Sequence, residues 1–142
     1  MKTLKASRHQ LANAFIQLKV LNTSPETIGA WPKFQEKLKA TGLFPLNPIG
    51  INTLQINVGK MCNQTCKHCH VDAGPDRQEI MTRQTMQQCL KVLANTDIPT
   101  VDLTGGAPEM NPNFRWFVDE IYKLEKKIIV RSNLTILVSN KK

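Results

Sequence analysis

Hydrophobic and polar residues alternate in three short segments of the second half of the chain. These segments cover residues 52–58, about 100–104 and about 127–133. A period of two residues is typical of β-strands that turn one face towards a core. The stretches between them carry apolar residues at helical spacing, namely Met86, Cys89, Leu90 and Leu93, then Phe114, Phe117, Val118, Ile121 and Leu124. The order strand, helix, strand, helix, strand predicts an α/β fold of parallel βαβ units.

Helix-capping and turn residues mark the ends of these predicted elements. Thr82 is a predicted N-cap, and Asn111-Pro112 is expected to start the second helix. Gly105-Gly106 ends the second strand. The segment from Gly59 to about Met81 has neither period, and a loop of this length is uncommon without a functional role. Residues 134–142 either begin a further element or fray.

Residues 1–50 are predicted to form a basic, partly helical leader, and residues 51–142 the core domain. Leu11, Ala14, Phe15 and Leu18 would share one face of a leader helix. A transit peptide is the alternative, since no acidic residue precedes Glu26. Thr23-Ser24-Pro25 is typical of a linker, and Pro32 is expected to open a short helix that stops at Gly42.

The two faces of the predicted strands differ in character. The apolar set is Leu54, Ile56, Val58, Val101, Leu103, Ile128 and Val130. The alternate set is Gln55, Asn57, Asp102, Thr104, Arg131 and Asn133. The interior of a filled (βα)8 barrel consists mostly of Val, Ile and Leu, so a polar face favours a wet cavity that holds a ligand. A partly solvated edge of the sheet is the alternative.

Composition narrows the class of protein. The chain has 142 residues and a mass of 16.0 kDa, which suits one domain, and it has no apolar run of about 18 residues that could span a membrane. Its net charge of +8 is mostly N-terminal, since residues 1–60 carry 8 Lys and Arg against 2 Asp and Glu. With 6% aromatic residues and no basic stripe, we expect no nucleic-acid partner. The clustered cysteines and the poor secretory signal predict a cytoplasmic protein.

Three of the four cysteines lie close together in the long loop. Cys62, Cys66 and Cys69 have the spacing C-x3-C-x2-C directly after the first strand, whereas Cys89 lies on a helical stripe and is expected in the core. Three soft thiolates on one loop suit zinc or an iron–sulfur cluster. In a four-iron cluster they would leave one iron without a protein ligand, and that iron could bind a small molecule.

Other interpretations of the cysteine loop stay open. Zinc could be held by the three cysteines with His68 or His70, because Cys3His sites are common. The run from Cys66 to His70 also satisfies the C-x-x-C-H pattern of a c-type haem, which requires export to an oxidising compartment. Unliganded thiols are the remaining alternative.

The loop resembles the cluster-binding motif of the radical S-adenosylmethionine (SAM) superfamily, with Cys62, Cys66 and Cys69 matching the three ligands. His68 stands where that motif has an aromatic residue beside the adenine. Residues 104–109 resemble the glycine-rich segment that receives the methionine amino group of SAM, although two residues separate the glycines from the acid. The resemblance implies a SAM site at His68, Gly105, Gly106, Ala107, Pro108, Glu109 and Asn133.

A narrower resemblance covers about residues 51–137. Segments 54–75, 103–112 and 130–135 are similar to the arsenosugar-biosynthesis radical SAM proteins. This resemblance implies that a reduced 4Fe–4S cluster cleaves SAM to a 5′-deoxyadenosyl radical, which joins a methylated trivalent arsenical. It also implies a small-molecule substrate and an electron donor such as flavodoxin or ferredoxin. The alternative is a small zinc-binding (Cys3His) interaction module without catalysis.

The resemblance implies the N-terminal part of a partial (βα)6 barrel of parallel strands, preceded by the short helical leader. Only three strands fit in residues 51–142, so we expect the first half of a truncated core domain. We expect the isolated chain to bind a cluster weakly and not to turn over.

Further side chains have two possible roles each. His70 and Asp72 either tune the cluster or solvate the loop. Lys60, Lys67 and Arg77 either offset its negative charge or are merely solvated. Trp116 and Tyr122 lie off the helical stripe and would pack against a neighbouring unit or a partner domain.

Overall fold

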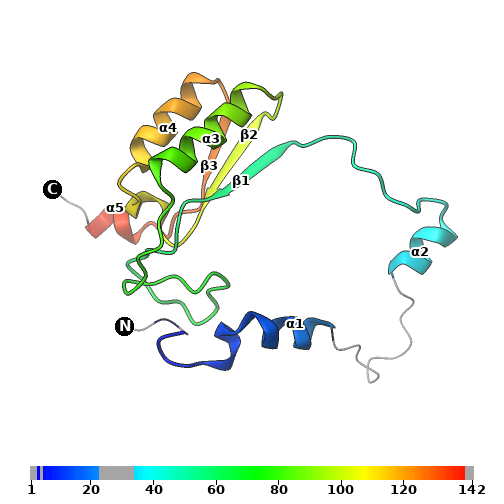
Figure 1. Ribbon diagram of the computed structural model, residues 1–142, viewed down its shortest axis with the longest axis horizontal. Coiled ribbons are helices and arrows are strands. Elements are labelled where there is room, and N and C mark those ends of the chain that lie inside the picture. The colour runs from blue at the N-terminus through cyan, green and yellow to red at the C-terminus, as the bar shows by residue number, and fades with distance from the viewer. Residues whose placement is uncertain (1–2, 4, 23–33, 140–142) are drawn as a thin grey trace.

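The computed structural model describes residue 3, residues 5–22 and residues 34–139. The elements follow the chain in this order: η1 (Gln10–Ala12), α1 (Ala14–Asn22), α2 (Phe34–Ala40), β1 (Thr53–Asn57), α3 (Arg83–Ala94), β2 (Thr100–Thr104), η2 (Pro108–Met110), α4 (Phe114–Lys123), β3 (Lys127–Val130) and α5 (Thr135–Ser139). Figure 1 shows α3 and α4 side by side over one face of the sheet.

The three strands form one parallel sheet in the order β1-β2-β3. Ile56 pairs with Leu103, and Val101 pairs with Ile128, and all four side chains pack in the core beneath the two helices. Val130, expected in the apolar set, is instead exposed at the end of β3. The predicted βαβ units are therefore confirmed. A three-stranded parallel sheet is consistent with part of a radical SAM barrel, and it brings the carboxyl ends of its strands to one edge.

The core lies between the sheet and the helices. It consists of the buried side chains of Ile56, Val58, Met86, Leu93, Val101, Leu103, Phe117 and Ile121. Cys89 packs against this cluster from α3, and burial raises the pKa of its thiol. The expected place of Cys89 in the core is confirmed, so this cysteine contributes apolar packing apart from the loop.

The start of the second helix differs from the expectation. α4 begins at Phe114, because the side chain of Asn111 is engaged elsewhere. Asn111 is 4% exposed, and its Nδ2 donates to the carbonyls of Val58 (2.9 Å) and Met81 (3.0 Å). Its Oδ1 accepts from the backbone N–H of Asn113 at 2.9 Å. Asn111 thereby joins the end of β1 to the segment before α3.

The third strand is shorter than expected and ends at Val130. The N–H of Arg131 still donates to the carbonyl of Leu103, but the next two side chains form local turns. Ser132 Oγ accepts from the N–H of Leu134 at 3.0 Å, and Asn133 Oδ1 accepts from the N–H of Thr135 at 3.1 Å. Such contacts compete with strand pairing, and here they start α5.

Trp116 packs within the unit, beside α3, and needs no neighbouring unit. The Arg83 guanidinium lies 4.0 Å from the centre of its ring, which is a cation–π distance. Tyr122 is 77% exposed, as a position off the stripe should be.

The second face of the sheet carries a polar network. Asp102 is buried on β2, and its carboxylate accepts from Gln55 Nε2 at 2.9 Å and from Arg131 NH2 at 2.7 Å. These hydrogen bonds, that of Arg131 first, lower the pKa of Asp102. The polar character of this face is as expected, whereas its role as a ligand cavity stays a prediction.

The leader is helical, but its apolar stripe is not buried by the described residues. Phe15 and Leu18 on α1 are exposed, and α2 buries none of its side chains. Gly42 has a φ of 73° just after α2, which agrees with the predicted helix stop. The predicted linker Thr23-Ser24-Pro25 and the helix start at Pro32 lie outside the described residues. No helix within the described ranges has the length and hydrophobicity to cross a membrane.

Candidate metal centre

The cysteine loop leaves β1 and folds back against its own start. The Cys62 N–H donates to the carbonyl of Gly74 at 3.2 Å, and the Gly74 N–H donates to the carbonyl of Lys60 at 3.1 Å. A further bridge joins Gly59 to Ile80. These contacts close the segment between β1 and α3 and hold the cysteines at the carboxyl edge of the sheet.

The three thiols of the loop differ in exposure. Cys62 is 6% exposed, Cys69 is half-buried, and Cys66 is exposed. The backbone N–H of Ala73 donates to the Cys69 sulfur at 3.3 Å, and the Cys69 N–H donates to the Cys66 carbonyl at 3.1 Å. Backbone donors to ligand sulfurs are one of the means by which proteins adjust iron–sulfur clusters.

The donor set of the loop is three thiols, a ligand type of both zinc and iron–sulfur clusters. Within the described ranges, no three His, Cys, Asp or Glu side chains converge as one metal ion requires. Zinc needs its ligands at the corners of one small tetrahedron. In a four-iron cluster each thiolate binds a different iron, so the sulfurs stay farther apart. That the three loop thiols hold such a cluster stays a prediction.

The glycine turn after β2 packs directly against the cysteine loop. The Gly106 N–H donates to the Gly59 carbonyl and the Ala107 N–H to the Met61 carbonyl, both at 2.9 Å. A Cβ on Gly106 would collide with the Met61 carbonyl oxygen and would lie 2.9 Å from Cys62 Cβ. Only glycine fits this position, so the two motifs singled out in the sequence meet in space.

Asn133 also reaches the cysteine loop. Its Nδ2 donates to the Cys62 sulfur at 3.4 Å and to Asn63 Oδ1 at 2.8 Å. Asn63 Nδ2 in turn donates to Thr135 Oγ1 at 3.0 Å. The start of α5 is thus tied to the first cysteine.

The remaining candidate SAM residues differ in their burial and in the residues that surround them. Ala107 is buried in a small cluster with Cys62 and Ala73, and Pro108 is fully buried beside it in the chain. His68 is exposed on the loop. Glu109 lines a separate cavity of about 490 Å3 between η2, α4 and α5, and its Oε2 is buried without a hydrogen-bond partner among the described residues. The contact of each residue with SAM stays a prediction.

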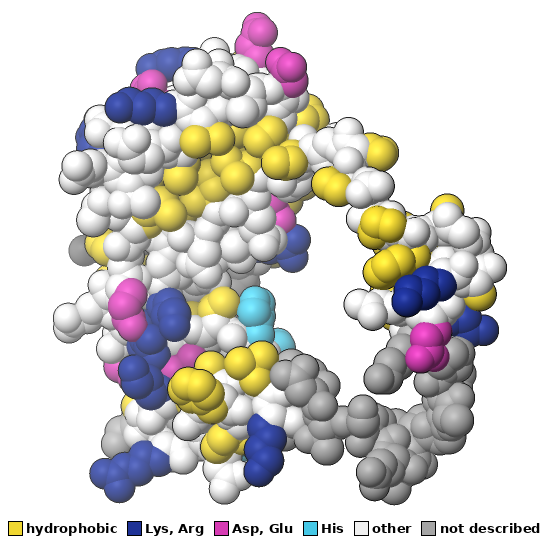
Figure 2. Space-filling model, turned by 45° about the vertical axis from the view of Figure 1, so that its right-hand side comes forward, with side chains coloured by type: hydrophobic (Ala, Val, Ile, Leu, Met, Phe, Trp, Pro, Cys, Tyr) yellow, Lys and Arg dark blue, Asp and Glu magenta, His cyan; other side chains and the backbone are white. Residues whose placement is uncertain are grey.

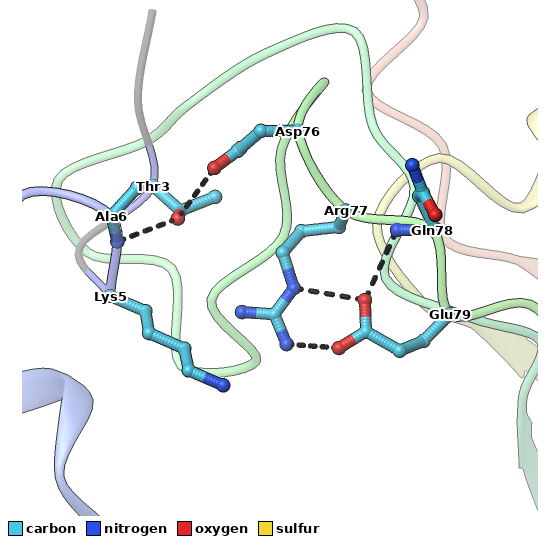
Figure 3. A pocket seen from close by; sticks show the side chains of 7 residues that line it. All are labelled: Thr3, Lys5, Ala6, Asp76, Arg77, Gln78 and Glu79. Carbon is cyan, nitrogen blue, oxygen red and sulfur yellow. Dashed lines mark hydrogen bonds and ion pairs between the residues drawn. The ribbon is translucent and has the colours of Figure 1, made fainter.

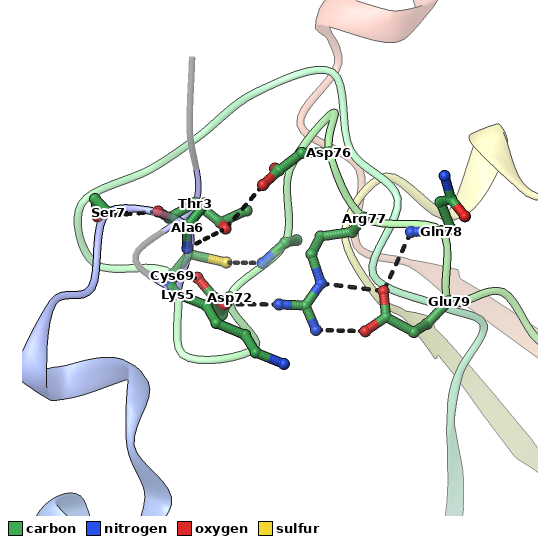
Figure 4. A network of polar contacts seen from close by, with 11 residues as sticks. Thr3, Lys5, Ala6, Ser7, Cys69, Asp72, Asp76, Arg77, Gln78 and Glu79 are labelled. Atoms are coloured by element: carbon green, nitrogen blue, oxygen red, sulfur yellow. Dashed lines mark hydrogen bonds and ion pairs between the residues drawn. The ribbon is translucent and has the colours of Figure 1, made fainter.

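The burial of Arg77 was not predicted from the sequence. Arg77 is 8% exposed, and its guanidinium donates to Asp72 at 2.8 Å and to Glu79 at 2.5 and 3.0 Å (Figure 4). The hydrogen bond with Glu79 is the first cause that raises the pKa of Arg77, and it lowers the pKa of Glu79 to about 2. The interpretation of Arg77 as merely solvated is wrong.

The N-terminal segment contacts the same part of the loop. Thr3 Oγ1 donates to Asp76 Oδ2 at 3.1 Å, and the Lys5 N–H donates to Asp72 Oδ1 at 3.3 Å. These two segments line an open pocket of about 480 Å3. Figure 3 shows the side chains that line it. Figure 2 shows basic and acidic side chains gathered in the lower left of the view. In the sequence, the acidic residues around Arg77 are the signal that indicates this network. The contact with the N-terminal segment leaves no signal in the sequence.

The comparisons with known proteins agree with this geometry. A model of the family described as a 4Fe-4S single cluster domain matches residues 53–140. The chain belongs to this family. The match covers the sheet, the cysteine loop and the glycine turn, and the whole leader (residues 1–50) lies outside it.

Three curated relatives of this 4Fe–4S domain are similar over about half of the chain or more. The probable GTP 3′,8-cyclase of Pyrococcus horikoshii is 29% identical over 85 residues, 60% of this chain and 26% of the relative. The antilisterial bacteriocin subtilosin biosynthesis protein AlbA of Bacillus subtilis is 26% identical over 76 residues, 54% of this chain and 17% of the relative. The GTP 3′,8-cyclase of Peptoclostridium acidaminophilum is 33% identical over 78 residues, 53% of this chain and 24% of the relative.

The chain therefore spans about a quarter or less of the length of these relatives. Together the matches support the radical SAM superfamily. They contain no arsenosugar-specific likeness, so the narrower resemblance stays a prediction.

Proposed function

We propose that this chain carries the cluster-binding part of a radical SAM enzyme. Cys62, Cys66 and Cys69 would hold a 4Fe–4S cluster, and the turn at Gly105 and Gly106 would receive SAM. The observation that carries the proposal is the packing of the glycine turn on the cysteine loop, where the Ala107 N–H donates to the Met61 carbonyl at 2.9 Å. Ligands of parallel α/β folds bind at the carboxyl ends of the strands, where both motifs lie.

When bound, a reduced cluster with an open iron would supply the electron that splits the sulfonium bond of SAM into methionine and a 5′-deoxyadenosyl radical. The residues of the chain bind and orient the reactants. Gly106 lets the backbone of the turn approach the loop closely, and Asn133 orients the Cys62 sulfur through a hydrogen bond. Ala107 and Ala73 pack apolar groups around Cys62, which limits the access of water.

The substrate proposal rests on the similarity of segments 54–75, 103–112 and 130–135 to arsenosugar-biosynthesis radical SAM proteins. We propose that a flavodoxin or ferredoxin supplies the electron and that the radical forms a carbon–arsenic bond with a methylated trivalent arsenical. The adduct then loses one proton to water and one electron to the oxidised electron donor, which leaves a pentavalent arsenical. Mass spectrometry of the products tests the acceptor. An adduct of the 5′-deoxyadenosyl group with arsenic supports it, and 5′-deoxyadenosine as the sole product rejects it.

A set of four cysteine variants tests the cluster proposal. After anaerobic reconstitution, iron, acid-labile sulfide and retained SAM are measured for Cys62→Ala, Cys66→Ala and Cys69→Ala, with Cys89→Ala as the matched control. We expect each loop variant to lose iron and SAM together and the control to keep the wild-type content. Equal losses in all four variants, or tight zinc in place of iron and sulfide, would reject the proposal.

A further inference from the structure

We propose that Arg77 is a positioning residue for the cluster loop and that the N-terminal residues complete its support. The group of Thr3, Lys5, Asp72, Asp76, Arg77 and Glu79 is called the brace here. The inference rests on the proposed cluster site, and it assigns a role to residues outside the three ligands and the glycine turn.

The first half of the brace is a buried arginine held by two carboxylates. Arg77 contacts Asp72 on one side and Glu79 on the other (Figure 4). The Asp72 N–H also donates to the Cys69 carbonyl at 3.2 Å, and Asp72 has a φ of 53°, a conformation that Asp tolerates better than most residues. Arg77 therefore fixes the turn that immediately follows Cys69 to the returning end of the loop.

The second half of the brace comes from the N-terminal segment. Thr3 is 2% exposed, and its Oγ1 accepts from the Ala6 N–H at 3.2 Å while donating to Asp76. Its methyl group packs so closely on Gly74 that a Cβ there would lie 2.5 Å from Thr3 Cγ2. The Gly74 carbonyl accepts from the N–H of Cys62. Thr3 therefore packs against the residue that is hydrogen-bonded to the first cysteine.

The chemistry of the brace requires arginine. A planar guanidinium can donate to two carboxylates at once, whereas a lysine ammonium is a point charge that cannot reproduce this fork. Loss of Arg77 leaves the half-buried Asp72 carboxylate without its partner, which costs more than the loss of a surface pair. The Glu79 side chain is 57% exposed, so its own loss costs less. Because the brace ties Cys69 through Asp72 and Cys62 through Gly74, its loss should release two of the three thiols from their fixed positions.

Thiol reactivity of the reduced chain without metal tests this inference. The alkylation rate of each cysteine by iodoacetamide is followed by peptide mass spectrometry, and Cys89 in the core serves as the internal reference. We expect Arg77→Gln to raise the ratio of Cys69 to Cys89 rates about fivefold by easing local opening. Arg77→Lys should give a smaller rise, and Arg115→Gln, which removes an exposed arginine on α4, should leave the ratio unchanged.

A milder variant keeps the inference testable if Arg77→Gln does not fold. Thr3→Val removes one hydroxyl and should raise the Cys62 to Cys89 ratio, with exposed Thr41→Val as its control. An unchanged ratio in folded variants, or an equal rise at all four cysteines, would overturn the positioning role. With the cluster loaded, Arg77→Gln should release iron to a chelator about tenfold faster. If no cluster forms in the wild type, the proposed function fails while the thiol ratios still decide on the brace.

Discussion

The side-chain amide of Asn133 donates to the sulfur of Cys62 at 3.4 Å across a sequence separation of 71 residues. The contact joins the segment after β3 to the loop after β1. Hydrogen bonds to ligand sulfurs are among the features that set the potential of an iron–sulfur cluster, because they stabilise the more negative, reduced state. In the proposed site, Asn133 would therefore act on the cluster through Cys62.

Removal of this donor should lower the reduction potential. For Asn133→Ala we expect a shift on the order of 50 mV to more negative values, which corresponds to the loss of about one hydrogen bond. A redox titration followed by electron paramagnetic resonance measures the shift. Gln87→Ala removes an exposed amide on α3 and should keep the wild-type potential. Equal potentials in Asn133→Ala and the wild type would show that the amide has no influence on the cluster.

The glycine turn should not tolerate one methyl group at Gly106. In Gly106→Ala the new Cβ would collide with the Met61 carbonyl, so the turn and the cysteine loop must separate. We expect a loss of about 1–3 kcal/mol in the free energy of unfolding of the metal-free chain, the usual cost of overpacking. Urea denaturation measures it. Gly50→Ala is the control, because a Cβ there meets no atom within 4 Å. A Gly106 variant as stable as that control would contradict the tight contact.

Asn111 should be as important for stability as a large core side chain. Asn111→Ala removes the donors to the carbonyls of Val58 and Met81. The Val58 carbonyl still accepts from the Met81 N–H at 2.9 Å, so the Met81 carbonyl is the one that loses its donor, at a cost of about 1–3 kcal/mol. We expect a loss of this size in urea denaturation. Asn113→Ala is the matched control, because the Asn113 side chain makes no capping hydrogen bond to α4. Equal losses in the two variants would argue against the bridging role.

The brace should make stability depend on acid pH. Hydrogen bonds from Arg77 lower the pKa of Glu79 to about 2, from a usual value of 4.5. A carboxylate with a lowered pKa contributes stability above its usual pKa and loses it as the pH falls towards the folded-state value. The free energy of unfolding should thus fall less between pH 4.5 and 2 in Glu79→Gln than in the wild type. Glu125→Gln, an exposed control, should keep the wild-type pH dependence, and an unchanged dependence in Glu79→Gln would refute the link.

Local periodicity predicted the elements that bury a face. Burial against the core produces the alternation around Ile56 and Val101 in the strands. It also produces the helical spacing around Met86 in α3 and around Phe117 in α4. The sequence pattern therefore predicted these strands and helices almost with their observed bounds. The spacing of the cysteines and the Gly-Gly turn placed both motifs at one edge of the sheet, because parallel strands end together.

Side-chain hydrogen bonds, both local ones and those between distant parts of the chain, were not predictable in this way. Ser132 and Asn133 form local turns that end β3 early, and Asn111 bonds to carbonyls far from it in sequence, so the periodic pattern misplaced both boundaries. The contact of Thr3 with Asp76 spans 73 residues and follows from packing on Gly74, which no spacing reveals. The exposed stripe of the leader shows the converse, since a helical period alone does not guarantee burial.

One measurement tests the central proposal most directly. The chain is reconstituted anaerobically with iron and sulfide, reduced, and examined by electron paramagnetic resonance with and without SAM. We expect a four-iron signal, of low yield given the expected weak binding, that changes when SAM is added and is absent in Cys66→Ala. A signal that does not change when SAM is added would contradict an open-iron cluster at Cys62, Cys66 and Cys69. A preparation that holds about one zinc ion per chain and no cluster would contradict it as well.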